Sequence, residues 1–308
     1  MSEPIRIAAS SRTVSLGRDI PAAARVPQES PVVFETLDAF GNVLRSEADL
    51  FSHAGPDCAN PATGPVFVEG AEPGDVLRVD ILDIQIVERG LIATMPGLGV
   101  MADLVAERTR FVPIRGNKAC LDWKTSAGIV RRELPIKPMI GVIGVAPAGE
   151  AEPTDYPGDH GGNMDCTRVA KGARLYLPVS AHGALFALGD LHALMGDGEV
   201  CICGVEMAGQ VTVSFKVIKG KSWPLPLLVE GQHFMALASH ESLDMAATLA
   251  TRRMHDFLVQ ELGLDPTAAA MLLSVEGNLR ICQVVDPRKT VRMELPLAIL
   301  REAGCDLA

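Results

Sequence analysis

The chain has 308 residues, 48% of them hydrophobic, with a net charge of −10 and a mean hydropathy of +0.22. This composition predicts a globular protein with enough apolar residues for a large core, and the acidic balance without Lys/Arg clusters excludes a nucleic-acid-binding protein. No stretch approaches the ~20 apolar residues of a membrane span and the N-terminus lacks a secretory signal, so we expect a cytoplasmic protein without a membrane partner.

Strand-like patterns dominate the chain. Residues 76–87 alternate apolar and polar side chains, the period-2 pattern of a strand with one buried face. Residues 138–145 form an apolar run rich in Val, Ile and Gly, which is typical of a fully buried strand. Further strands are predicted at residues 31–38, 174–179, 204–206, 211–218 and 280–285.

Two helices are predicted near the C-terminus. Residues 240–263 carry apolar side chains at close to 3.6-residue spacing, with Ser239 as the N-cap and Gly263 at the end. A second helix covers residues 266–273, capped by Asp265. The sequence therefore predicts an α+β, β-dominated fold with a C-terminal helical pair, in a single domain over residues 1–308. A sub-boundary near 130–150 is an alternative, because the prolines there also fit turns inside one domain.

Seven cysteines are scattered along the chain without a CxxC pair. In a chain without a secretory signal we expect them to be free and buried. Cys201-Ile202-Cys203 is predicted to be a strand that points its two thiols to opposite faces.

Acidic residues and histidines concentrate in two segments, residues 155–165 and 189–199, where glycines separate them. Asp, Glu and His supply the oxygen and imidazole ligands of divalent cations. The interleaved glycines let the backbone turn sharply and approach a ligand closely. A metal-assisted hydrolase site is therefore the first hypothesis.

Asp190 and His192 are two residues apart, so in a strand they share one face and form half of a metal site. The alternative for each residue alone is structural, with Asp190 capping a turn and His192 a buried, satisfied histidine. The whole set favours a metal, because so many acids repel one another unless they lie apart or bind a cation. The set comprises Asp159, His160, Asp165, Asp190, His192, Asp197, Glu199 and Glu206.

Glu199 and Glu206 lie on or near the strand that follows the second segment. A carboxylate beside a metal-bound water can accept its proton, so either Glu fits a general base and either fits a ligand. Serine catalysis is the main competing mechanism, but the chain has no Gly-x-Ser-x-Gly motif to supply the nucleophile. A Cys166 nucleophile is disfavoured, because its acidic neighbours are expected to raise the thiol pKa.

Long motifs follow one another along the chain at residues 60–75, 137–147, 158–165, 183–199 and 272–287. Together they resemble the acetamidase/formamidase family of amide hydrolases over roughly residues 30 to 295. One departure is Gly277-Asn278-Leu279, where an acidic residue is expected in the tail motif. If that acid orients a ligand in the family, Asn278 alters metal affinity or substrate choice.

The resemblance implies hydrolysis of formamide or acetamide to ammonia and carboxylate, in β-sandwich or barrel layers with zinc or calcium. The implied metal ligands are Asp38, Asp165, Asp190, His192 and Glu206. Glu199 or Glu206 exchanges the proton, and the oxyanion and substrate contacts fall to Asn163, His160, Gly161 and Gly162. The alternatives are a hydrolase of another amide or cyclic C–N bond, and a catalytically idle metal- or ligand-binding scaffold. The apolar residues to spare also predict a homo-oligomer.

Overall fold

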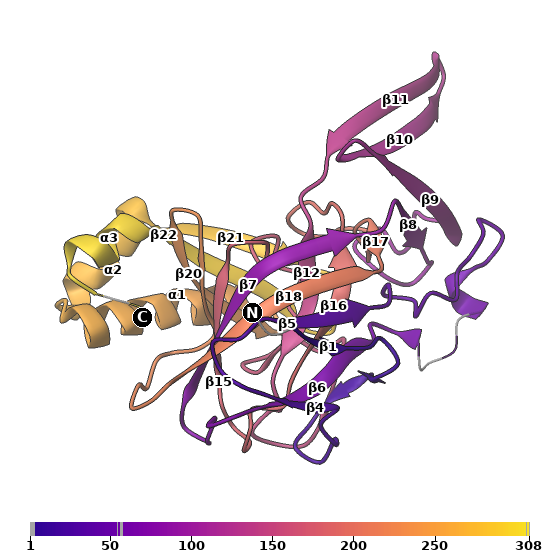
Figure 1. Cartoon of the computed structure of the whole chain (residues 1–308). Coiled ribbons are helices and arrows are strands. Elements are labelled where there is room, and N and C mark those ends of the chain that lie inside the picture. The colour runs from indigo at the N-terminus through magenta and orange to yellow at the C-terminus, as the bar shows by residue number, and fades with distance from the viewer. Residues whose placement is uncertain (1–3, 54, 56–57, 306, 308) are drawn as a thin grey trace.

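The computed structural model describes residues 4–53, 55, 58–305 and 307. Within these residues the chain forms two large β-sheets, one small one and three α-helices. Figure 1 shows the helices gathered at one end of the molecule and a hairpin projecting from the sheets at the other. The predicted β-dominated α+β fold is therefore confirmed. Residues 1–3, 306 and 308, at the ends of the predicted domain, lie outside the described residues.

The first large sheet combines strands from both ends of the chain. Its spatial order is β1 (Ile5–Ile7), β5 (Val32–Thr36), β18 (Gly209–Ile218), β7 (Val76–Ile86), β15 (Arg174–Pro178), β19 (Leu227–Glu230), β20 (His233–His240), β22 (Lys289–Pro296) and β21 (Asn278–Gln283). The predicted alternation is visible in β7, where Leu77, Val79 and Ile81 are buried and the polar Arg78 and Asp80 between them are partly exposed. These residues belong to the main hydrophobic core, so β7 joins the sheet through its apolar face.

The second large sheet carries most of the acidic segments. Its order is β11 (Gly128–Pro135), β10 (Lys118–Thr125), β9 (Arg108–Arg115), β8 (Arg89–Thr94), β17 (Glu206–Met207), β16 (Phe186–His192), β12 (Met139–Gly144) and β14 (Gly161–Asn163). β6 (Ala62–Val68) also pairs with β16 and itself pairs with β2 (Arg12–Thr13) and β4 (Ala24–Val26), while β13 (Glu152–Pro153) pairs with β3 (Ser15–Leu16). Every residue of β12 and β16 is buried, and β12 is the apolar strand covered on both faces that its sequence predicts.

The C-terminal helices are α1 (Leu243–Leu262), α2 (Pro266–Glu276) and the short α3 (Leu297–Glu302). The predicted N-cap Ser239 is wrong, because Ser239 lies in β20 and the Ser242 side chain caps α1 by accepting from the Met245 N–H. Period-2 and period-3.6 patterns overlap here, which hid the boundary. Gly263 ends α1 at φ 65°, and Asp265 caps α2, as predicted. No helix in the described residues is long and apolar enough to cross a membrane.

Two features were not anticipated from the sequence. Cys201-Ile202-Cys203 is a turn rather than a strand, because Ile202 has φ 87°, and the two free thiols hydrogen-bond to each other. The β10–β11 hairpin projects from the body of the molecule (Figure 1), with Trp123, Ile129 and Val130 exposed.

We expect Phe257→Ala to lower the free energy of unfolding by about 3–5 kcal/mol, measured by chemical denaturation. Phe257 is fully buried between Phe234 and Trp223, with ring centroids 4.7 and 5.9 Å away. Met245→Ala, on the same helix at 42% exposure, is the control and should change stability by less than about 0.5 kcal/mol. Equal effects of the two substitutions would contradict this packing.

Candidate metal centre

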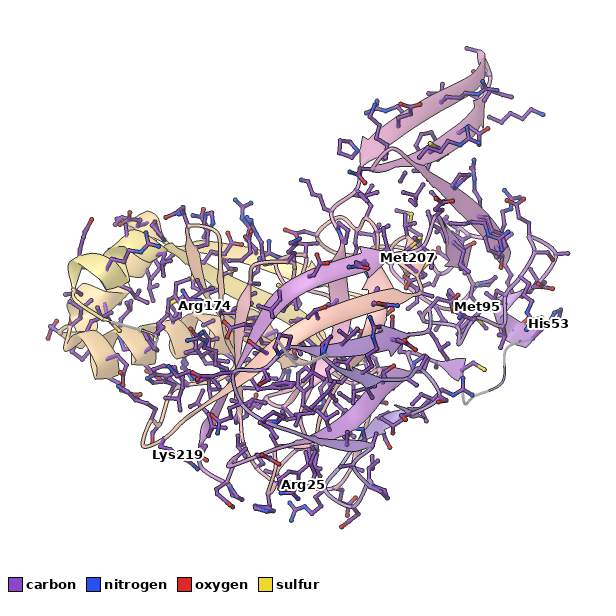
Figure 2. The ribbon with its side chains drawn as sticks, viewed as in Figure 1. Arg25, His53, Met95, Arg174, Met207 and Lys219 are labelled. Carbon is purple, nitrogen blue, oxygen red and sulfur yellow. The ribbon has the colours of Figure 1, made fainter. Side chains whose placement is uncertain are left out.

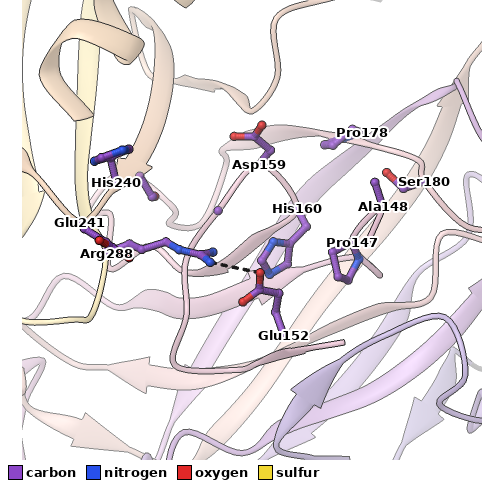
Figure 3. A pocket seen from close by; sticks show the side chains of 12 residues that line it. Pro147, Ala148, Glu152, Asp159, His160, Pro178, Ser180, His240, Glu241 and Arg288 are labelled. Atoms are coloured by element: carbon purple, nitrogen blue, oxygen red, sulfur yellow. Dashed lines mark hydrogen bonds and ion pairs between the residues drawn. The ribbon is translucent and has the colours of Figure 1, made fainter. Parts of the chain in front are cut away.

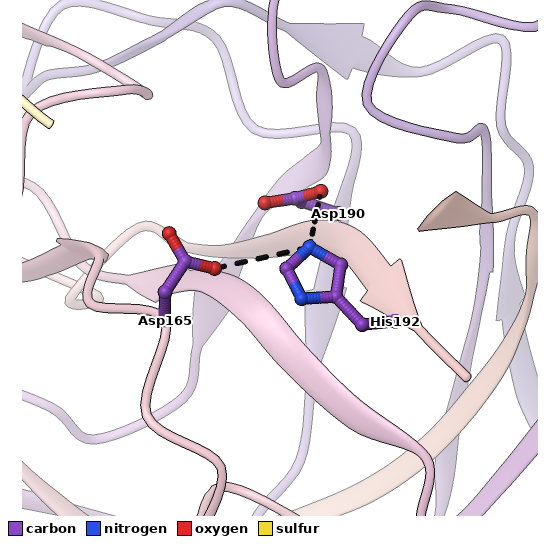
Figure 4. A group of neighbouring side chains, drawn as sticks. All are labelled: Asp165, Asp190 and His192. Atoms are coloured by element: carbon purple, nitrogen blue, oxygen red, sulfur yellow. Dashed lines mark hydrogen bonds and ion pairs between the residues drawn. The ribbon is translucent and has the colours of Figure 1, made fainter. Parts of the chain in front are cut away.

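One buried imidazole lies among four buried carboxyl groups. The Nε2 atom of His192 is 3.1 Å from Glu206 Oε2 and 3.3 Å from Asp190 Oδ1. It is also 3.8 Å from Asp165 Oδ1 and 3.8 Å from Glu199 Oε1. Figure 4 shows Asp165 and Asp190 directed at the same ring nitrogen. Asp190 and His192 lie together on β16, as the two-residue spacing predicts, and Glu206 is opposite His192 on β17.

Three of these acids have an unusual backbone conformation. Asp165, Asp190 and Glu199 have φ values of 42°, 56° and 47°, in the left-handed region that side chains with a β-carbon rarely occupy. Such residues cost free energy and concentrate at functional sites, where the surrounding structure holds them in place. The backbone is therefore bent to direct these carboxyl groups inward rather than along a regular strand.

Gly141, in the middle of β12, makes the close approach of two acids possible. A β-carbon at this position would overlap with the carboxylates of Asp190 and Asp165. β12 pairs with both β14 and β16, so its backbone lies directly beneath the cluster. Sequence analysis missed this residue, although an isolated glycine within an apolar strand is the pattern that signals a close approach.

The pKa values of the cluster follow from its burial. Loss of solvent, together with the charge of Asp190, raises the pKa of Asp165 to about 7. Burial likewise raises the pKa of Glu206 to about 8 and that of Glu199 well above its ordinary value. Burial opposes the charged form of His192, but Glu206 and Asp190 raise its pKa well above the ordinary value. The cluster therefore has four acidic groups and, in His192, a single side chain that can carry a positive charge.

The cluster has the donor atoms of a divalent metal site. Asp165, Asp190 and His192 each offer a ligand atom within 4.8 Å of the others, and so do His192, Glu199 and Glu206. Asp165 Oδ1 and Glu206 Oε2 are buried and have no hydrogen-bond partner in the described part of the chain. One imidazole nitrogen with carboxylate oxygens suits zinc better than calcium, which prefers oxygen ligands alone. The residues therefore fit a metal ion.

A cavity of about 400 Å³ opens onto the cluster. Asp190, His192, Glu199 and Glu206 line it, and so does Asn163. The cavity also contains Asp286, a buried acid that the sequence analysis did not select, whose pKa is raised by burial and by Asp165. Asn163 hydrogen-bonds to this carboxyl group.

The structure thus adds Asp286, from the tail motif, to the acids at the cavity. Asn278, in the segment where an acid was expected, is exposed at the start of β21 and donates to the Glu276 carbonyl at 3.4 Å. Direct influence of Asn278 on a ligand is therefore not supported. Asp286 follows β21, whose end is bonded to the loop that carries Glu199: the Gly198 N–H donates to the Cys282 carbonyl, and the Val284 N–H donates to the Gly198 carbonyl.

The structure places other predicted residues beside the cluster. Asp38 Oδ1 accepts from the N–H groups of Phe40 and Asn42, so this carboxylate stabilises a turn near Asp190. The Gly161 N–H donates to the Gly158 carbonyl at 3.1 Å, and Gly162 pairs with Ile143 in the β12–β14 ladder. These backbone groups already serve the local fold.

His160 lies in a different cavity, of about 460 Å³, shown in Figure 3. An ion pair of 3.2 Å between Glu152 and Arg288 lines the same cavity. Burial lowers the pKa of His160 to about 4, so its ring is neutral at physiological pH. The structure therefore does not bring His160 together with His192.

Two acids of the predicted set and one thiol have structural partners instead. Asp159 pairs with Arg253, and Asp197 with Arg292. Cys166 is fully buried, and its predicted pKa shift is wrong in direction. Burial raises that pKa, but the hydrogen bond with Cys282 and the charge of Arg292 outweigh burial and lower it.

The sequence pattern described as the Acetamidase/Formamidase family matches residues 15–154 and 148–302. The chain belongs to this family. The acetamidase of Bacillus halodurans has the same fold, with a TM-score of 0.92 and 41% identity over 97% of this chain and 100% of that one. A predicted acetamidase/formamidase of Thermoanaerobacter tengcongensis has a TM-score of 0.93 and 41% identity over 99% of both chains.

The curated relatives match the chain over only part of their own length. The formamidase of Methylophilus methylotrophus is 32% identical over 51% of this chain and 51% of its own length. The aligned part of the chain spans about half to two thirds of the length of the curated relatives, at 62%, 51% and 64%.

We expect a divalent cation to stabilise the folded protein, because it neutralises buried carboxylates that the unfolded chain exposes. At a hundredfold excess over Kd the gain should be about 2.7 kcal/mol. Thermal unfolding of chelator-treated protein, with and without Zn²⁺ or Ca²⁺, measures it. His192→Ala should lose the gain, and His182→Ala, at a side chain that is 64% exposed, should keep it. An unchanged melting temperature with either ion would contradict a metal site.

Gly141→Ala should disrupt the cluster, since the added methyl group displaces the Asp165 and Asp190 carboxylates. We expect a loss of about 1–3 kcal/mol in unfolding free energy, together with loss of the stabilisation by cation. Gly149→Ala is the matched control, because a β-carbon there meets open space. Retention of cation binding by Gly141→Ala would show that the two carboxylates do not act as ligands.

Proposed function

We propose that the protein is a metal-dependent amidase that hydrolyses a short-chain amide, such as formamide or acetamide, to ammonia and carboxylate. The observation that supports it best is the buried cluster around His192 at a cavity, in a chain of the acetamidase/formamidase family. Membership of the acetamidase/formamidase family alone supports amide hydrolysis as the reaction class. The cluster adds a reason for metal dependence, because its donor atoms suit a hard or borderline cation.

Asp165, Asp190, His192 and Glu206 are the proposed ligands. A divalent cation held there supplies Lewis acidity toward the amide carbonyl. Glu206 suits a ligand better than a base, because its Oε1 accepts from the Gly204 N–H at 2.8 Å while Oε2 faces His192. The backbone bond fixes the carboxylate in one orientation.

Glu199 is the proposed general base. Its Oε1 lies 3.8 Å from His192 Nε2, and the side chain lines the cavity where water and substrate enter. In this role it accepts a proton from the attacking water and returns it to the leaving nitrogen, so that amide and water give carboxylic acid and ammonia.

Asn163 is proposed to orient the substrate. Its Oδ1 is buried and has no hydrogen-bond partner among the residues described. A carbonyl oxygen accepts rather than donates, so it matches the N–H groups of a substrate amide better than an oxyanion. The unbonded Oδ1 of Asn163 is thus suited to accept a hydrogen bond from the amide nitrogen of the substrate, which leaves as ammonia.

The test is ammonia release from formamide, acetamide and propionamide before and after chelator treatment, with elemental analysis of the same sample. Loss of activity with chelator and its return with one metal would support the proposal. Bound metal without turnover of any C–N substrate would instead favour the idle scaffold.

Glu199→Gln should lower kcat by roughly 10²–10⁴-fold while metal content is unchanged. The control is Glu276→Gln, at an exposed position on α2, which should leave kcat unaltered. Loss of metal from Glu199→Gln would assign this residue to the ligands instead.

A further inference from the structure

The residues that line the cavity at the candidate metal centre divide into two chemical groups. One is the acidic cluster. The other is apolar: Phe40, Ala93 and Ala39 are buried members of one hydrophobic cluster, with Phe51 and Cys203 packed against it. The rings of Phe40 and Phe51 meet edge to face with centroids 5.1 Å apart. These residues therefore form one continuous apolar wall.

The apolar wall begins beside the reactive groups. Cys203 packs against the wall and lies close enough to Glu206 for that carboxylate to help raise its thiol pKa. Met95, Leu98 and Ile202 add further apolar side chains to the lining. Figure 2 shows Met95 at the end of the molecule away from the helices. A group bonded to a carbonyl carbon at the cluster would thus contact the wall.

The cavity is larger than the smallest amides need. Its volume of about 400 Å³ falls in the range of roughly 300–1,000 Å³ for pockets that enclose ligands of drug size. Formamide and acetamide have three and four non-hydrogen atoms, so either would leave most of the apolar wall in contact with water.

The charges around the cavity exclude one type of acyl group. Apart from the proposed ligands Asp190, His192 and Glu206, the acids in the lining outnumber the bases, so an anionic chain end would be repelled. These acids are Asp155, Glu199 and Asp286, against Lys289. Lys289 donates to the Asp286 carbonyl at 2.9 Å and is already engaged. A neutral chain fits both the wall and the charge.

We infer that the preferred substrates are neutral primary amides with an apolar acyl chain of several carbons or an aromatic ring. This rests on the proposed amide hydrolysis. Phe51 and Leu98 contribute to the preference, because Phe51 is a half-buried ring of the wall and Leu98, 37% exposed, adds an apolar side chain to the same lining.

The experiment measures kcat/KM by ammonia release for acetamide, butyramide, hexanamide and phenylacetamide. Burial of each added methylene should raise kcat/KM by about fourfold until the wall is covered. Succinamic acid, with a carboxylate at the chain end, should be at least tenfold poorer than butyramide. A kcat/KM that is highest for acetamide and falls with chain length would overturn the inference and leave amide hydrolysis intact.

Variants separate the wall from the rest of the loop. Phe51→Ala and Leu98→Ala should each lower kcat/KM for hexanamide at least fivefold and change that for acetamide by less than twofold. Leu104→Ala is the matched control, since Leu104 is 78% exposed on the same loop and does not line the cavity. Equal losses for both amides, or equal effects of Leu98→Ala and Leu104→Ala, would overturn the assignment.

If no amide in the series releases ammonia, the proposed function is overturned rather than this inference. Calorimetric titration with hexanamide then decides. Binding that Leu98→Ala weakens and Leu104→Ala does not would keep the apolar site, and absence of binding would remove it.

Discussion

The interior of this protein holds more negative charge than its own side chains can balance, and the structure of the site depends on that constraint. Burial of an unpaired carboxylate costs several kcal/mol, and His192 can offset only one of the four acids around it. The buried guanidinium of Arg292 does not help, because it is bonded to Asp197 and Glu294. The remaining solutions are protonation, as the raised pKa values of Asp165 and Glu206 indicate, or a bound cation.

The fold offsets the repulsion between these acids by placing each of them on a different strand or loop. His192 and Glu206 face each other across β16 and β17, while Gly141 gives Asp165 and Asp190 room above β12. Glu199 lies on a loop that is tied to the C-terminal part of the chain. The Asp197–Arg292 ion pair fixes this loop, and the Gly198 N–H donates to the Cys282 carbonyl. The helical end of the protein therefore stabilises the site through β21 and β22.

The local sequence pattern was sufficient to predict part of the fold and part of the site. The alternation of β7, the cap at Asp265 and the pairing of Asp190 with His192 follow from side-chain periodicity within a few residues. Asp286 and Gly141 could not be assigned in that way, because contacts over long sequence separations bring them to the cluster, namely the Gly198–Gln283 bridge and the β12–β16 pairing. His160 illustrates the converse. It lies near Asn163 in sequence, but the tight turn at Gly158–Gly161 directs it into another cavity.

The short pairing between β8 and β17 brings apolar and acidic groups to one cavity. β8 and β17 pair at Leu91 and Glu206, and beyond this point Cys203 replaces the missing strand partner. Its Sγ atom accepts from the Ala93 N–H at 3.1 Å and lies 3.0 Å from the Ala93 carbonyl oxygen. A thiol satisfies these backbone groups without the backbone of another strand, so the strands can separate while their polar atoms stay bonded. Ala93 of β8, a member of the apolar wall, therefore lines the same cavity as Glu206 of β17, which joins the acidic cluster to the apolar wall.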